Sequence, residues 1–154
     1  AGLVLPWQSE RCVSVWQGAK QAKGRQRWQA TALQAAKQAR RTRVPAVDEV
    51  RDTRALIAWV AQMVQSGGVV LVLHEEARTP ISTAMESMRL PAPGTAPLVL
   101  AVVVGPEGGI SPEETAALEA AGAMTVRLGP HVMRTASAGP VALAVLAHAS
   151  GLWE

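Results

Sequence analysis

The chain has 154 residues, of which 49% are hydrophobic and 18% charged, and its mean hydropathy is +0.14. This length and composition predict one globular domain with a real core and exclude a disordered chain. No apolar run is long enough to span a bilayer, and the apolar start at 3–7 lacks the basic segment of a secretory signal. The single cysteine, Cys12, cannot form an intrachain disulfide, which suits a reducing compartment.

Charge is distributed unevenly along the chain. Residues 1–43 contain nine basic residues and one acid, a net charge of +8, whereas residues 44–154 carry a net charge of −5. We call residues 1–43 the basic segment. Such a segment predicts a surface that faces a polyanion such as nucleic acid, although a solvated helix face explains the charge equally well.

The first elements follow from hydrophobic periodicity. Residues 3–7 and 12–16 are predicted to be short strands, the second of which would bury Cys12 as a small hydrophobe. Residues 20–40 have the period of a helix whose apolar face includes Trp28, which we predict to be a core residue. A basic loop at 40–45 should end this helix.

Capping residues and glycines delimit the middle elements. A helix is expected at Thr53–Gln65, with Asp52 as its N-cap and Gly67–Gly68 as its stop. The unbroken apolar run Val69–Leu73 predicts a strand that is buried on both faces. Residues 77–97 are predicted to be rich in loops, with one helical turn around 82–88.

The last elements complete an α/β pattern. Strands are expected at 98–104 and 124–128, and a helix at 111–121 with a capping box of Ser111 and Glu114. A closing helix at 138–149 is apolar nearly all round and should be buried or pack on another subunit, with Pro140 in its first turn. Strands that alternate with helices predict an α/β fold with a mostly parallel sheet flanked by helices.

Two glycine-containing corners, 105–109 and 128–135, each join an apolar strand to a helix. The carboxyl ends of parallel strands meet at one edge of a sheet, so we expect these corners to form a small-molecule pocket. Phosphate is a poor ligand for the first corner, because no lysine follows its glycines and Glu107, Glu113 and Glu114 are acidic. A ligand with an amine or cationic centre fits better, and S-adenosylmethionine has both.

Both corners resemble those of one known family. The first contains the residues Gly105-Pro106-Glu107-Gly108-Gly109-Ile110-Ser111-Pro112-Glu113-Glu114, and the second contains Val126-Arg127-Leu128-Gly129-Pro130 and then Met133-Arg134-Thr135. Together with segments 27–45 and 71–75, they resemble the ribosomal RNA small-subunit methyltransferase E family of the SPOUT superfamily. The resemblance covers nearly the whole chain in the right order.

This resemblance implies an S-adenosylmethionine-dependent enzyme that methylates N3 of a uridine in small-subunit (16S) ribosomal RNA, within the assembled subunit. It also implies a C-terminal trefoil knot, a homodimer and a cytoplasmic location, with no membrane and no metal. The chain would be one SPOUT-type domain, 1–154, without the first strand and helix of that domain and without the preceding RNA-binding β-barrel. A further departure is Ala136-Ser137-Ala138, where many members have Glu-Thr-Ala.

The resemblance implies that three loops hold the cofactor. Their residues are Leu73, His74, Glu75, Gly105, Pro106, Glu107, Gly108, Gly109, Leu128, Gly129, Val132, Met133, Arg134 and Thr135. The glycines would let backbone amides and carbonyls approach the adenine and the ribose.

Methylation requires that uracil N3 lose its proton, so the site needs a base or a cation that stabilises the uracil anion. Arg134 is our catalytic candidate, because a guanidinium donates two parallel hydrogen bonds to an anionic edge. There are two alternatives: Arg134 has a structural role, or His74 acts as the general base that accepts the proton of N3. Arg40, Arg41 and Arg43 are the candidates for RNA binding.

Two other functions remain open on the sequence alone. The chain could be a non-catalytic RNA-binding or dimerisation module, or an α/β nucleotide-binding domain of another kind. No cluster of cysteine and histidine residues suggests a metal.

Overall fold

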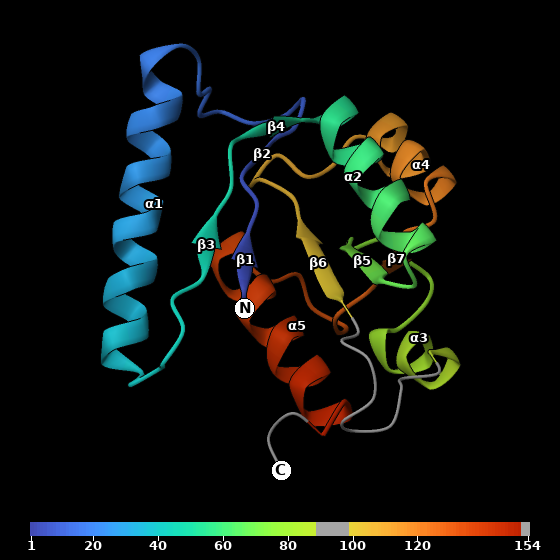
Figure 1. The fold of residues 1–154 in the computed structure, drawn as a ribbon. Coiled ribbons are helices and arrows are strands. Elements are labelled where there is room, and N and C mark those ends of the chain that lie inside the picture. The colour runs from blue at the N-terminus through green and yellow to red at the C-terminus, as the bar shows by residue number, and fades with distance from the viewer. Residues whose placement is uncertain (89–98, 152–154) are drawn as a thin grey trace.

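A computed structural model describes residues 1–88 and 99–151 (Figure 1). Its elements are β1 (Leu3–Val4), β2 (Trp7–Gln8), α1 (Ala19–Gln38), β3 (Ala46–Val47), β4 (Arg51–Asp52), α2 (Thr53–Gln65), β5 (Val69–Leu73), α3 (Ile81–Ser87), β6 (Leu100–Val104), α4 (Pro112–Ala120), β7 (Met124–Val126) and α5 (Thr135–Ala149). Every strand pair in this part of the chain is parallel, which confirms the predicted α/β class.

The central sheet has the strand order β6-β5-β7. Its middle strand, β5, is the unbroken apolar run, and Val70, Leu71 and Val72 are each 1% exposed or less. The chain leaves β5 for β6 on one side and later returns to β7 on the other. This reversal of direction is the kind of place where α/β proteins bind ligands at the carboxyl edge.

Helices cover both faces of this sheet and make two apolar clusters. Val70 and Val72 pack with Leu56, Val60 and Leu118 of α2 and α4. Leu71, on the opposite face of the same strand, packs with residues of α3 and α5. The alternation of side chains along a strand therefore divides one apolar run between two half-cores.

The predicted caps are confirmed. Asp52 Oδ1 accepts a 2.7 Å hydrogen bond from the amide of Ala55 at the start of α2, and Gly67 ends that helix with φ of 82°. At α4, Ser111 Oγ accepts from the amide of Glu114, and Glu114 Oε2 accepts from the amide of Ser111, each at 3.2 Å. These bonds satisfy donors that the helices leave free at their first turns.

Two predictions for the first forty residues are wrong. Residues 12–16 form no strand but a turn and an irregular segment, where Val13 is 93% exposed. Trp28 is not a core residue, because 44% of it is exposed and its ring meets the ring of Trp16 edge to face at 5.3 Å. The cause is the placement of α1, which stands to one side of the molecule beside β3 (Figure 1).

The closing helix also differs from the prediction. It begins at Thr135 instead of 138, so Pro140 lies inside the helix, beyond the first turn. The ring removes one helical hydrogen bond, but the carbonyl left free belongs to Ala136, which is exposed to water. Strand β7 is two residues shorter than expected and β6 begins at Leu100, while the predicted loop at 89–97 and Leu98 lie outside the described residues.

Candidate functional site

A cleft of about 930 Å³ lies at the carboxyl edge of the central sheet. Three stretches line it, one after each strand: 73–76 after β5, 104–110 after β6, and 127–136 after β7. The two glycine corners predicted to meet in space therefore do so, and the loop after β5 joins them. The lining includes every residue that the resemblance assigned to the cofactor.

Glycines in the first corner allow tight packing. A Cβ on Gly105 would lie 2.6 Å from Cγ1 of Ile110, and one on Gly108 would lie 3.0 Å from the carbonyl oxygen of Arg11. Gly109 has φ of +75°, a conformation that side-chain-bearing residues rarely adopt. At Gly105 and Gly108 the space that a side chain would fill is therefore occupied by Ile110 and Arg11 of the protein itself, and not by the expected ligand.

Arg134 lies at the end of the second corner and caps α5. Its carbonyl accepts hydrogen bonds from the amides of Ser137 and Ala138, at 2.8 and 3.0 Å, which fixes its backbone at the first turn of the helix. Its side chain is exposed and lines the cleft. Within the described residues no hydrogen bond or ion pair holds its guanidinium, so that group is available to a ligand.

His74 makes hydrogen bonds through both its backbone and its side chain. Its amide donates to the carbonyl of Val126 at 3.0 Å, and its Nδ1 accepts from the amide of Glu76 at 3.2 Å. Of the two candidates, Arg134 is the one whose side chain has no hydrogen-bond partner among the described residues.

Arg11 also lines the cleft, and its place there could not be predicted. It belongs to a turn in which the amide of Cys12 donates to the carbonyl of Ser9. Its Nη1 lies 3.4 Å from the carbonyl oxygen of Gly108, across 97 residues of sequence. In the sequence it was simply one of nine cations in the basic segment.

Glu114 has a larger role than its capping box suggested. The side chain is 6% exposed, and Oε1 accepts hydrogen bonds from the Glu10 amide at 2.9 Å and from Thr53 Oγ1 at 2.6 Å. Thr53 Oγ1 in turn accepts from the indole nitrogen of Trp7 at 3.2 Å. One carboxylate thus joins β2, the turn that carries Arg11, α2 and α4.

The three arginines predicted to bind RNA do not line the cleft. Arg40, Arg41 and Arg43 lie in the exposed loop that follows α1, where Arg40 has φ of 51° and Arg41 Nη1 donates to the carbonyl of Ala1. They are free to meet a partner, at a distance from the glycine corners.

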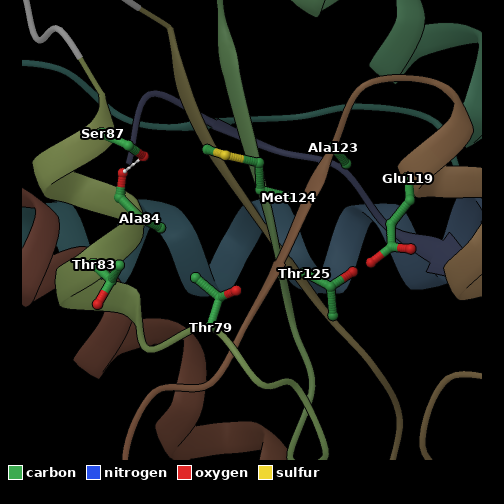
Figure 2. Close-up of a pocket in the computed structure, with 8 residues that line it drawn as sticks. All are labelled: Thr79, Thr83, Ala84, Ser87, Glu119, Ala123, Met124 and Thr125. Atoms are coloured by element: carbon green, nitrogen blue, oxygen red, sulfur yellow. Dashed lines mark hydrogen bonds between the residues drawn. The ribbon is translucent and has the colours of Figure 1, made fainter.

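A second hollow, of about 350 Å³, lies along β7, the edge strand (Figure 2). Its lining residues are Thr79, Thr83, Ala84, Ser87, Glu119, Ala123, Met124 and Thr125. Ser87 Oγ donates to the carbonyl of Ala84 at 2.7 Å, and Thr125 Oγ1 is buried with no hydrogen-bond partner among the described residues. No cation in the described part of the chain lines this hollow, whereas the larger cleft joins the loops that follow all three strands of the central sheet, so the larger cleft is the better candidate.

Residues 1–88 and 99–151 contain no group of three or more histidine, cysteine, aspartate or glutamate residues arranged to hold a metal ion. No helix in this part of the chain has the length and apolar character needed to cross a membrane.

Comparison with known proteins identifies the family of this chain. A family model for RNA methyltransferase domains matches residues 1–147. The chain belongs to this family. Proteins named ribosomal RNA small subunit methyltransferase E from Mycobacterium bovis and Mycobacterium tuberculosis are each 46% identical to this RNA methyltransferase domain over all 154 residues. The Bacillus subtilis protein of the same name is 30% identical over 149 residues.

These names confirm the resemblance that the two corners suggested. The chain covers 56% of each of the three relatives, so it spans little more than half of their length. Among solved structures, a ribosomal RNA small subunit methyltransferase E from Neisseria gonorrhoeae bound to S-adenosylmethionine matches 95% of this RNA methyltransferase domain, with a TM-score of 0.78 and 25% identity. The match covers 54% of that chain.

A putative methyltransferase from Legionella pneumophila, in complex with the same cofactor, matches 96% of this domain and 55% of its own chain, with a TM-score of 0.74 and 27% identity. The described fold of the domain is therefore that of methyltransferases whose solved structures contain the cofactor.

Proposed function

We propose that the protein is an S-adenosylmethionine-dependent methyltransferase that acts on N3 of a uridine in 16S ribosomal RNA, in the cytoplasm. The observation that carries the proposal is the cleft in which the two glycine corners and the loop 73–76 converge. The names of the relatives and the cofactor in two structural neighbours support it.

The residues present fit this cofactor. The cleft provides backbone groups of the two corners together with the carboxylates of Glu75 and Glu107, and no P-loop lysine is there to favour a triphosphate. Residues of 73–75, 105–109 and 128–135 would hold the cofactor, which supplies an electrophilic methyl group when bound. We also propose that the chain around 128–135 forms the trefoil knot of SPOUT enzymes.

The protein's own contribution is to prepare the nucleophile. Uracil N3 attacks only after it gives its proton to solvent water, and the resulting negative charge spreads to the neighbouring carbonyl oxygens. We propose that Arg134 stabilises that charge; its backbone is fixed at the start of α5 and its guanidinium has no partner among the described residues, which supports this role. We assign Glu107 the role of orienting the cofactor instead of accepting a proton.

Ligand binding tests the proposed function directly. We expect S-adenosylmethionine and S-adenosylhomocysteine to bind in a calorimetric titration, and ATP to give no heat of binding, because the acidic corner lacks phosphate-binding groups. Binding of ATP with no binding of S-adenosylmethionine would contradict the proposal and favour a nucleotide-binding domain of another kind. Binding without methyl transfer to unmethylated small ribosomal subunits would favour a non-catalytic module.

The exposed arginines after α1 should contribute to RNA affinity without reading sequence. We expect the triple change of Arg40, Arg41 and Arg43 to glutamine to weaken RNA binding. The slope of log K against log salt concentration, which we call the salt slope, should fall by about two units, because each lost phosphate contact removes about 0.7 units on single-stranded RNA. The measurement is fluorescence anisotropy with a labelled RNA at several KCl concentrations. An unchanged slope would show that this loop is merely solvated.

We propose that the protein is a homodimer. One face of α5 lies against the protein's own sheet: Ala142 is fully buried, and a Cβ on Gly139 would lie 3.4 Å from Val104. In the second corner and α5, the exposed large apolar residues are Val132, Met133, Val141 and Leu143, which are 73%, 40%, 37% and 38% exposed. A second subunit would cover them.

A charge on this patch should separate the subunits. We expect the wild type to be a dimer by light scattering at micromolar concentration and Leu143→Glu to be a monomer, because a buried unpaired carboxylate disfavours the interface. Leu33→Glu, on α1, is the matched control, since Leu33 is also 38% exposed. A monomeric wild type would contradict the dimer.

A further inference from the structure

Arg11 is the residue at which the basic segment reaches the cleft. Among the described residues of 1–43 it alone contributes to the cleft lining. The other cations of this segment, which has a net charge of +8, lie on α1 or in the loop after it. Arg11 is therefore the cation of the basic segment that an RNA in the cleft would meet.

The backbone of Arg11 is held rigidly. Ser9, at the start of the turn, is 4% exposed, and its carbonyl accepts from the amide of Cys12 at 3.2 Å. The amide of Glu10 donates to the buried carboxylate of Glu114 at 2.9 Å, and the backbone of Arg11 lies against Gly108 with no space for a side chain between them. A rigid backbone lowers the entropy that a binding side chain loses when it orders.

The side chain of Arg11, in contrast, keeps most of its hydrogen-bonding capacity. It is exposed, and its one hydrogen bond among the described residues is the long 3.4 Å contact with the carbonyl oxygen of Gly108. The described residues contain one ion pair, Arg51 with Asp48, so no carboxylate neutralises Arg11 there. A guanidinium with free donors at an exposed rim matches the geometry of a phosphate group.

We propose that Arg11 binds a backbone phosphate of the RNA next to the nucleotide whose base enters the cleft. This inference rests on the function proposed above and names one residue that holds the substrate. A phosphate fits better than the carboxylate of the cofactor, because Arg11 lies on the exposed rim and belongs to the segment along which RNA would approach. Its role is to bind and position the substrate, and it takes no part in proton or methyl transfer.

The test compares Arg11→Gln and Arg11→Lys with Arg54→Gln in the complete protein. Arg54 is an exposed cation in the first turn of α2, so Arg54→Gln removes the same charge from a place outside the cleft. Initial rates of methyl transfer to unmethylated small ribosomal subunits give kcat and KM, anisotropy with a labelled single-stranded RNA gives the salt slope, and calorimetry gives the affinity for S-adenosylmethionine.

We expect Arg11→Gln to raise KM for the subunits about tenfold with kcat within twofold of the wild type. The salt slope should fall by about 0.7 units, and the cofactor affinity should not change. Arg11→Lys should keep the salt slope and recover part of the affinity, since lysine retains the charge but lacks the fork. Arg54→Gln should behave as the wild type.

Two results would overturn the inference while leaving the proposed function intact. One is an Arg11→Gln protein that matches Arg54→Gln in KM and in salt slope. The other is a loss of cofactor affinity with an unchanged salt slope, which would assign Arg11 to the cofactor. If the wild type bound neither S-adenosylmethionine nor the subunits, the proposed function would be wrong, and so would the proposal that Arg11 binds an RNA phosphate.

Discussion

Replacing Arg134 with alanine is expected to lower kcat for methyl transfer by about 100- to 1000-fold, the usual effect of removing a preorganised group that stabilises transition-state charge. The affinity for RNA should remain within a few-fold of the wild type, because Arg134 is proposed to act on the uracil anion, which exists only during the reaction. Single-turnover transfer of a labelled methyl group to unmethylated small subunits measures this directly.

The design of this experiment separates chemistry from folding. Arg134 caps α5 through its backbone carbonyl and not through its side chain, so alanine preserves both hydrogen bonds of the cap. Arg134→Lys should recover only a small part of the rate, because an ammonium cannot give two parallel hydrogen bonds. Near-normal turnover of Arg134→Ala would show that this residue has only a structural role and that another group in the cleft stabilises the uracil anion.

The second large effect concerns stability. Glu114→Ala is expected to lower the free energy of unfolding by about 3 kcal/mol or more, because a buried donor that loses its partner contributes about 1–3 kcal/mol of destabilisation. The side chain is 6% exposed and accepts from the Glu10 amide, the Thr53 hydroxyl and the Ser111 amide. For a domain of this size such a change is a large part of the total stability.

Urea unfolding followed by tryptophan fluorescence measures this change. Glu113→Ala is the matched control, since Glu113 is also in the first turn of α4 but is exposed, and it should change the stability by less than about 1 kcal/mol. Glu114→Gln should lie between the two, because its amide keeps one acceptor oxygen and turns two protons toward donors. Equal midpoints for Glu114→Ala and Glu113→Ala would show that the carboxylate does not join these elements.

Local chemistry made several elements predictable from the sequence alone. The bounds of α2 follow from Asp52 and from Gly67–Gly68, and the start of α4 follows from the capping box, because these signals act within one helical turn. The run Val69–Leu73 could only be a strand buried on both faces. The two glycine corners could be placed together because parallel strands end at a common edge.

Contacts between distant residues decided the rest. Periodicity placed Trp28 on an apolar helix face, but only the position of α1 determined that this face stays half exposed. The apolar closing helix was equally compatible with burial in this chain and with a partner subunit, and the structure packs one of its faces on β6. Arg11 meets Gly108 across 97 residues, and Glu114 meets Glu10 across 104. Separations of this length leave no periodic signal in a sequence, so only the folded chain shows which cation stands at the cleft and which carboxylate holds it there.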